Sequence, residues 1–502
     1  MELDFSSQAH YLLAFLPEII LTVFGMVVLV TGVWKKEGEG RAGTDHLGAL
    51  GLVGIIISAG ANGWLYGMSG GDGIVVIDRF RLFANWIFLL AGALSILISL
   101  AYVTRQRLQS GETYALMLFA VVGMMVMGGT QNLIIIFLGL EVMSISVYAL
   151  AAMNRRDRRS AEAGLKYFLL GAFSTGFFLY GIALSYGATG STDVAEIAQA
   201  IREGAAAGPL LAFGIAFLAI GFGFKVAAVP FHMWTPDVYE GAPAPITAFM
   251  ATGVKAAAFV AFLRVFMVAF PSVSGEWYSI LWWLAAITMV VANLIALVQS
   301  NIKRMLAYSS IAHGGYLIVG VVAANQMASG AMLFYLLVYT LMNIGAFAIV
   351  ISVAHQGEDR LQIEDYAGFG WQQPLLGVFL TIFLLSLAGF PGTGGFIGKI
   401  FLLQGAVDAD LWTLAIVLVL ATLVSYWYYL RVAWYMWMRE APGPDAHAAV
   451  FSPLTMRFAL FGAAGLILLL GIFPSAFGFL DFVQSSVESL WNAGAIMAQG
   501  GP

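Results

Sequence analysis

Apolar runs long enough to cross a lipid bilayer recur along this chain, and they limit what it can fold into. A bilayer core of about 30 Å needs roughly 20 apolar residues in a helical span. Such runs follow one another from Tyr11 to Phe473, and 61% of all residues are hydrophobic while only 10% are charged. Soluble domains have about a quarter of their residues charged. The pattern therefore indicates a polytopic membrane protein.

The expected fold class is all-α, a polytopic membrane protein with about fourteen transmembrane helices. Segments such as 375–387 and 411–424 are apolar on every side, which is typical of membrane helices and not of the short alternating strands of a barrel. The expected spans lie near residues 11–33, 46–68, 80–103, 112–129, 131–152, 160–187, 208–230, 245–270, 277–299, 303–323, 328–354, 372–403, 411–437 and 455–477.

Three absences narrow the range of functions. The first apolar run follows Glu2 and Asp4 without a basic segment or a small-residue cleavage site, so we expect the first span to stay in the mature protein. The chain has no cysteine, which excludes disulfides, iron–sulfur clusters and thiolate metal sites within it. We expect no metal and no cofactor in this chain. The net charge of −5, with no basic stripe, gives no indication of nucleic-acid binding.

The loop charges predict an orientation, because cytoplasmic loops carry an excess of Lys and Arg. Fourteen basic residues fall on one side and three on the other. The larger set is Lys35, Lys36, Arg41, Arg105, Arg107, Arg155, Arg156, Arg158, Arg159, Lys303, Arg304, Arg360, Arg439 and Arg457, and the smaller set is Arg79, Arg81 and Arg202. Both termini are therefore expected in the periplasm of a bacterial inner membrane.

Seven charged residues remain inside the expected spans. They are Glu141, Lys166, Lys225, Lys255, Arg264, Lys399 and Arg431. Six are cations and one is an anion, so pairing within the set cannot neutralise them. Since burial disfavours the charged form of a lysine, some of these lysines should be neutral part of the time, as a proton carrier requires. Arginine stays protonated and cannot serve in this way.

Depth separates the functional candidates from the structural ones. Glu141 and Lys255 lie about 15 Å into their spans, near the bilayer centre, where an ionisable residue is a functional hypothesis by default. Arg264 and Arg431 lie near span ends, so we expect both side chains to reach the interface. Lys166 lies close to a basic loop, and both readings stay open for it.

Two spans are interrupted close to an intramembrane lysine. Segment 221–237 contains Pro230 and Pro236 with His232 between them, and segment 386–399 contains Pro391 among five glycines. Freed backbone groups at membrane depth are tolerated where they are buried in protein or line a water-filled cavity, and paired interruptions are typical of transporters with internal repeats. The alternative to such a transport site is that the two helices merely bend at their prolines. The breaks predict two inverted five-helix repeats.

The predicted domain organisation follows from these breaks. Residues 1–110 form helices 1–3, residues 111–271 the first repeat (helices 4–8), residues 272–438 the second repeat (helices 9–13), and residues 439–502 helix 14 and a tail.

Four motifs of the chain are long and specific when taken together. The longest is PFHMWTPDVYEGAPAP at 230–245, followed by Lys255. The others are LGLE at 138–141, NIKRMLAYSSIAHGGY at 301–316 and GFPGTGGFIGK at 389–399. Together they resemble the antiporter-like proton-translocating subunits of NADH-quinone oxidoreductase (respiratory complex I) and of Mrp antiporters. The form of the first motif, lysine at position 399 and the lack of a long C-terminal lateral helix resemble the N branch of this family more than its L and M branches.

The resemblance implies roles for the buried charges. It implies a Glu–Lys pair at Glu141 and Lys225, a central lysine at Lys255, and Lys399 on the half-channel towards the periplasm. His232 and Tyr308 resemble hydrogen-bonding members of the hydrophilic axis between them. A helix-break cap for His232 and an interfacial tyrosine for Tyr308 remain alternatives.

The resemblance also implies a function and partners. The chain would translocate protons while FMN, iron–sulfur clusters and quinone act in partner subunits, and its neighbours would be the M subunit, small K- and J-type subunits and membrane lipid. Two alternatives remain, an Mrp-type Na⁺/H⁺ antiporter subunit and a structural subunit that does not pump. A Na⁺ site would favour clustered carboxylates, and Glu141 is the one plain candidate.

Overall fold

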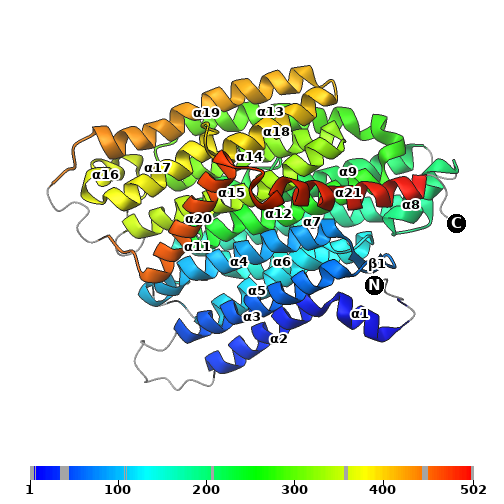
Figure 1. The fold of residues 1–502 in the computed structure, drawn as a ribbon, viewed down its shortest axis with the longest axis horizontal. Coiled ribbons are helices and arrows are strands. Elements are labelled where there is room, and N and C mark those ends of the chain that lie inside the picture. The colour runs from blue at the N-terminus through cyan, green and yellow to red at the C-terminus, as the bar shows by residue number, and fades with distance from the viewer. Residues whose placement is uncertain are drawn as a thin grey trace.

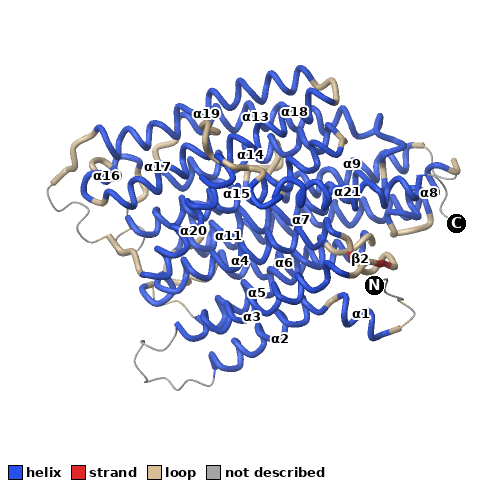
Figure 2. The backbone as a smooth tube through the Cα atoms, viewed as in Figure 1, coloured by secondary structure: helices blue, strands red, loops and turns tan. Residues whose placement is uncertain are grey.

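The computed structural model describes residues 5, 7–33, 45–106, 108, 110–204, 208–354, 360–443 and 450–498. Within these residues the chain is almost entirely helical, with one short β-hairpin (Figures 1 and 2), so the all-α fold class is confirmed. The basic residues Lys35, Lys36, Arg41 and Arg107 lie outside the described residues.

The helices of the first part of the chain are α1 (Gln8–Ala14), α2 (Leu16–Val33), α3 (Asp45–Trp64), α4 (Arg79–Arg105), α5 (Ser110–Gly128), α6 (Leu133–Ala151), α7 (Arg158–Thr189), α8 (Val194–Arg202), α9 (Pro209–Lys225), α10 (Trp234–Gly241), α11 (Ala244–Phe249) and α12 (Lys255–Ala269). Those of the second part are α13 (Ser274–Leu297), α14 (Ile302–Ala323), α15 (Gln326–Val353), α16 (Phe369–Gln372), α17 (Pro374–Ala388), α18 (Gly394–Asp408), α19 (Trp412–Met438), α20 (Leu454–Ile472) and α21 (Phe479–Ala498). Strands β1 (Gly70–Gly71) and β2 (Val76–Ile77) form the hairpin.

Twelve helices of the described chain are long and apolar enough to cross a membrane. They are α2 to α7, the continuous α11–α12 helix, α13, α14, α15, α19 and α20. Two shorter apolar helices, α9 and α17, occupy the segments in which the sequence predicts interruptions. The count of about fourteen spans therefore depends on whether the two interrupted segments also cross the membrane, and it stays a prediction.

The helices begin where polar side chains cap them. The side chains of Asn132 and Asn301 accept hydrogen bonds from backbone N–H groups in the first turns of α6 and α14. Asp157 does the same for α7 and Asp193 for α8. Such caps satisfy donors that have no partner within the helix, so each apolar run starts at a defined residue.

The most buried helices form the centre of the molecule. Within an 18-residue apolar stretch of α11–α12 every residue is buried, and in the corresponding stretches of α14 and α15 the buried share is 94%. By contrast, the buried share is 28% in α2 and 39% in α7 and α19, so these three helices lie at the periphery. In Figure 1, α12, α14 and α15 run through the middle of the bundle, while α2 and α19 lie at its two edges.

The two ends of the bundle differ in charge. We call the end at the left of Figure 1 the basic end, because α4 ends there at Arg105 and α19 ends beside Arg439. Helices α1 and α8 and the β-hairpin lie at the opposite end, on the right. The last described helix, α21, also ends on the right, so the first and last helices are at the same end of the bundle.

Two isolated backbone pairings relate the halves of the chain. Asn132 pairs with Asp193 and Asn301 with Gln362, both antiparallel. Both asparagines are N-caps, of α6 and of α14. The first pairing lies at the end that holds α8, whereas Asn301 begins a helix that starts at the basic end. Equivalent pairings at opposite ends are what inverted repeats would give, and the repeat boundaries stay a prediction.

Both expected interruptions are present. Helix α9 ends at Lys225 and α10 begins at Trp234, while α17 ends at Ala388 and α18 begins at Gly394. In the second break, Gly389 has a φ of 85°, a conformation that glycine adopts at little cost. One expected detail is wrong, because Pro236 does not interrupt a helix. It lies in the first turn of α10, where proline is tolerated.

Two elements were not expected from the sequence. A π-helical turn, η3 (Met250–Val254), immediately precedes Lys255, and such turns often occur at functional sites. The segment after α20, expected to be a tail, forms the 20-residue helix α21. This helix is amphipathic and only moderately apolar, and it is not among the twelve helices apolar enough to cross a membrane.

Candidate functional site

Lys255 lies in the most buried helix of the molecule, directly after the π-helical turn. Its Nζ donates to the carbonyl oxygen and to the hydroxyl oxygen of Ser310 in α14, each at 2.6 Å. The residue is 2% exposed, and no carboxylate forms an ion pair with it in the described part of the chain. Neutral oxygens of one facing helix therefore hold this ammonium group.

Lys225 is the last residue of α9, beside the first break. Its Nζ donates to the hydroxyl of Ser144 at 2.8 Å and to the hydroxyl of Tyr148 at 3.2 Å, both in α6. Glu141 lies on the same helix, one turn before Ser144, and is half-buried. One oxygen of Glu141, Oε1, is buried without a hydrogen-bond partner.

The direct Glu141–Lys225 ion pair that the resemblance implies is not formed in this structure. None of the ion pairs between described residues includes either side chain, and Ser144 and Tyr148 hold the lysine instead. The spacing explains the substitution, because positions 141, 144 and 148 follow one another on one face of a helix. The glutamate is therefore adjacent to the lysine site without occupying it.

Lys399 uses the backbone that the second break exposes. Its Nζ donates to the carbonyl oxygens of Leu387 and Ala388, the last residues of α17, each at 2.9 Å. Carbonyls at a helix C-terminus lack partners within the helix and carry partial negative charge. The Nζ also lies 5.0 Å from the centre of the Tyr316 ring. The break therefore supplies the site that accommodates the buried cation.

His313 of α14 lies between Lys255 and Lys399. The sequence analysis did not single it out. Its Nδ1 is 2.5 Å from the hydroxyl oxygen of Tyr335 and its Nε2 is 3.0 Å from that of Tyr429. Tyr429 also shares a hydrogen bond with Ser309. The ring is 1% exposed. Both ring nitrogens thus have a partner that can donate or accept a proton.

One face of α14 connects the sites of Lys255 and Lys399. Ser310, His313 and Tyr316 are spaced three residues apart, which places them along one side of the helix. Ser310 contacts Lys255, and Tyr316 lies against Lys399, with His313 between them. This spacing was visible in the sequence as polar residues at i, i+3 and i+6, and it could have identified the histidine.

Lys166 belongs to a different environment from the other lysines. Its Nζ forms ion pairs with Glu162 at 2.7 Å and Asp237 at 2.8 Å, and its side chain is 40% exposed. Asp237 also pairs with Arg304, which pairs in turn with Glu240. This charge cluster connects α7, α10 and α14 at the basic end. Lys166 is therefore not part of the buried lysine set.

The cluster borders a cavity and affects the titration of Asp237. A polar cavity of about 180 Å³ is lined by Lys166, Asp237, Glu240 and neighbouring residues. Partial burial of Asp237 acts in the opposite direction, but the hydrogen bonds from Lys166 and Arg304 hold the pKa of its carboxyl below the usual range. The carboxylate thus stays ionised at neutral pH.

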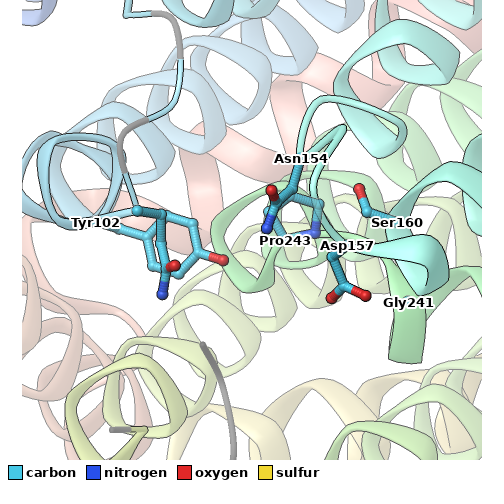
Figure 3. Close-up of a pocket in the computed structure, with 7 residues that line it drawn as sticks. Tyr102, Asn154, Asp157, Ser160, Gly241 and Pro243 are labelled. Atoms are coloured by element: carbon cyan, nitrogen blue, oxygen red, sulfur yellow. The ribbon is translucent and has the colours of Figure 1, made fainter. Parts of the chain in front are cut away.

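A smaller polar pocket lies nearby, and Figure 3 shows it between Tyr102 on one side and Asn154 and Asp157 on the other. Gly241 and Pro243, at the corner between α10 and α11, also line it. Its volume of about 10 Å³ corresponds to about one water molecule. Polar space therefore reaches the start of the helix that carries Lys255.

His232 and Tyr308 are less engaged than expected. His232 lies in the loop between α9 and α10, half-buried, and its Nδ1 is buried without a hydrogen-bond partner. Tyr308 is half-buried and packs against the apolar core, and no hydrogen bond of its hydroxyl links it to the described polar groups. Among the described residues, no hydrogen bond joins either side chain to Lys225, Lys255 or Lys399.

The two arginines inside spans are bound to other groups. Arg264 is completely buried and forms a two-pronged ion pair with Asp78, at 2.7 and 3.0 Å, and the expectation that it reaches the interface stays a prediction. The Asp78 carboxylate, supplied by the N-cap of α4, makes burial of this charge possible. Arg431 donates to the carbonyls of Leu297 and Gln299 at the end of α13.

Known proteins resemble this chain in sequence. Residues 130–425 match the family model described as NADH:quinone oxidoreductase/Mrp antiporter, TM. The chain belongs to this membrane family. NADH-quinone oxidoreductase subunit N of Trichlorobacter lovleyi is 48% identical over 479 residues, which cover 94% of this chain and 96% of that protein. Subunit N 2 of Koribacter versatilis is 44% identical and covers 95% of this chain and 96% of its own length.

Solved structures of antiporter-like proteins agree in fold. A chain of respiratory complex I from Thermus thermophilus is 35% identical with a TM-score of 0.78, covering 92% of this chain and 98% of its own. A chain of a Dietzia Mrp complex, at 19% identity, covers 96% of this chain and 99% of its own with a TM-score of 0.80, which shows the shared fold.

Among the described residues, no group of three or more His, Cys, Asp or Glu could hold a metal.

Proposed function

We propose that this chain is a proton-translocating membrane subunit of NADH-quinone oxidoreductase, in the position of subunit N. The chain is then part of a proton-translocating NADH:quinone reductase and carries out no redox chemistry itself. The observation that carries the proposal is the buried row Lys255, Ser310, His313, Tyr316 and Lys399, which places two lysines at either end of one polar helix face. The names of close relatives point to the same function.

The residues of this row have the chemistry that proton transfer requires. Lysine and histidine can release and accept a proton, while arginine cannot. Hydroxyl groups donate and accept hydrogen bonds at once, so Tyr335 and Tyr429 can carry a proton to and from His313. A proton that reaches Lys255 from the basic end would pass His313 and leave through Lys399 towards the opposite end.

Glu141 and Lys225 act as a switching pair in this proposal. The lysine is held by Ser144 and Tyr148 in the present arrangement, and the neighbouring glutamate has an oxygen without a partner. A rotation of either side chain would exchange these hydroxyls for the carboxylate. The protonated lysine is stabilised when the pair is closed and can pass its proton towards Lys255 when the pair opens.

The energy must come from partner subunits, because this chain has no cysteine ligands for iron–sulfur clusters. We propose that FMN, iron–sulfur clusters and quinone act in those partners. The direct neighbours would be the M subunit and small K- and J-type subunits. The complex would lie in the bacterial inner membrane with the basic end in the cytoplasm, which places both termini in the periplasm.

Two alternatives would use the same fold. An Mrp-type Na⁺/H⁺ antiporter subunit would need carboxylates for the sodium ion, and the described core offers only the half-buried Glu141, since Glu18 and Asp78 pair with arginines. A structural subunit would not need lysines held by neutral oxygens in its most buried helices. The site therefore favours proton translocation.

Variants of the two terminal lysines test the proposal. In the complete complex reconstituted in vesicles, Lys255→Met and Lys399→Met should each reduce proton uptake coupled to NADH oxidation by tenfold or more. Lys399→Arg should also reduce this proton uptake, since arginine keeps its charge but cannot release the proton. Complex yield is measured in parallel as the control. Full pumping by a well-assembled Lys399→Met complex would remove this lysine from the path, and a loss of yield without a pumping defect would favour the structural alternative.

A further inference from the structure

An apolar crevice lies on the outside of the molecule, away from the lysines. Two adjoining cavities, of about 280 Å³ and about 480 Å³, share the side chains of Leu337, Phe479 and Phe482. Helices α4, α15, α20 and α21 form its walls. The crevice exists because α21 lies across α4 and α15, with the Phe479 ring against Phe83 and Phe334.

The depth of the crevice corresponds to one leaflet of a bilayer. Tyr66 lines it at the end of the bundle that holds the β-hairpin, and Leu90 of α4 lines its inner part. Because α4 begins at Arg79 and rises 1.5 Å per residue, Leu90 lies about 16 Å along the helix. One leaflet of the hydrocarbon core is about 15 Å thick. The apolar lining thus spans the length of one lipid tail.

The outer end of the crevice has groups suited to a lipid headgroup. The Tyr66 hydroxyl is buried beside the Trp86 side chain and near Arg79. Arg79 is exposed, whereas Arg81 of the same helix turn is completely buried in an ion pair with Glu18. Tyrosine and tryptophan favour the headgroup level of membranes, and arginine binds phosphate through several N–H donors.

We propose that this crevice binds one phospholipid, with an acyl chain between α4, α15, α20 and α21 and its phosphate at Arg79 and Tyr66. The lipid would come from the leaflet on the side of the two termini. It would cover apolar side chains that neither α20 nor α21 reaches, and it would stabilise α21 on the bundle.

Photolabelling of the complete complex in nanodiscs tests the site. The probe is phosphatidylglycerol with a diazirine in the middle of one acyl chain, and labelled peptides are located by mass spectrometry. We expect labelling of peptides from α21 and the start of α4 at least fivefold above that of the outer face of α19. Equal labelling of the two surfaces would overturn the proposal, as would cross-links from this crevice to another subunit, which would then be its occupant.

Two variants distinguish the tail site from the phosphate site. Ala476→Trp fills the crevice from the turn before α21 and should reduce the labelling at least fivefold, while Val419→Trp on the exposed face of α19 is the matched control and should not. Arg79→Gln should reduce labelling by phosphatidylglycerol but not by diacylglycerol carrying the same chain, which lacks the phosphate. Labelling unaffected by Ala476→Trp would exclude the tail site, and equal effects of Arg79→Gln on both probes would exclude the phosphate contact.

Discussion

At the scale of single residues, the buried lysines are held by oxygens that carry no formal charge. Lys255 relies on Ser310, Lys225 on Ser144 and Tyr148, and Lys399 on helix-end carbonyls. A carboxylate partner would stabilise the ammonium form strongly, whereas hydroxyls and carbonyls do so less. These three ammonium groups therefore lack the carboxylate partner that Arg264 has in Asp78.

His313 gives the first prediction at this scale. His313→Gln removes the group that can both take up and release a proton, so we expect proton uptake by reconstituted complex to fall about tenfold or more with assembly retained. Tyr308→Phe is the matched control on the same helix, because the Tyr308 hydroxyl makes no hydrogen bond to the described polar groups. A pumping defect in Tyr308→Phe equal to that of His313→Gln would assign the path to the other face of α14.

Asp237 gives a second prediction at this scale, on pH. Because the folded-state pKa of its carboxyl lies below the usual range, its contribution to stability is present above the pKa of the unfolded state and is lost as pH falls through the folded-state pKa. Asp237→Asn should therefore lower stability by about 1 kcal/mol or less, by the same amount at pH 8 and at pH 5. The midpoint of thermal unfolding measures this, and a difference that vanished at pH 5 would show that the carboxyl titrates higher.

At the scale of elements, the two broken helices provide sites that intact helices could not. A break leaves the last carbonyls of α17 without backbone donors, and the Lys399 ammonium group donates hydrogen bonds to them. The short break keeps the start of α18 close to the end of α17, so a Cβ at Gly395 would overlap the carbonyl oxygen of Ser386. The lysine site thus depends on close backbone contact across the break.

Gly395→Ala tests this dependence. The added methyl group must push the two half-helices apart, and overpacking of this kind costs about 1–3 kcal/mol. We expect a lower thermal midpoint and weaker pumping. Gly462→Ala in α20 is the control, because a Cβ there meets nothing within 4 Å and alanine favours helix by up to about 1 kcal/mol. A neutral Gly395→Ala variant would contradict the packing argument.

At the scale of the whole molecule, two buried ion pairs connect the first helices to the rest of the bundle. Arg81 of α4 pairs with Glu18 of α2, and Arg264 of α12 pairs with Asp78 at the start of α4. The partners in these pairs are far apart in sequence. Helices α2 and α4 are therefore connected by ion pairs to the helix that carries Lys255, at the end opposite to the basic end.

The orientation of the whole molecule can be measured with single cysteines, since the natural chain has none. Arg156→Cys and Glu203→Cys place exposed thiols at the basic end and at the opposite end. In intact cells, an impermeant thiol reagent should label the second and not the first, because basic loops stay in the cytoplasm. Labelling of Arg156→Cys alone from outside would reverse the orientation and the direction of every proposed proton step.

The sequence by itself determined the membrane class, the helical fold, the two interruptions and the lysines. These features are local, because they follow from the spacing of apolar residues and from a charge or a proline inside an apolar run. The sequence also contained the polar spacing of Ser310, His313 and Tyr316, although that signal is weak among so many serines and tyrosines.

Only the tertiary structure decided which groups contact the charges. Asp78 meets Arg264 across 186 positions, and Lys225 meets Ser144 in place of Glu141 across 81 positions. Such contacts depend on helix rotation and depth, and a shift of one helical turn, about 5.4 Å, exchanges one partner for another. The same holds for α21, because its amphipathic sequence becomes informative only when α4 and α15 supply the surface on which it lies.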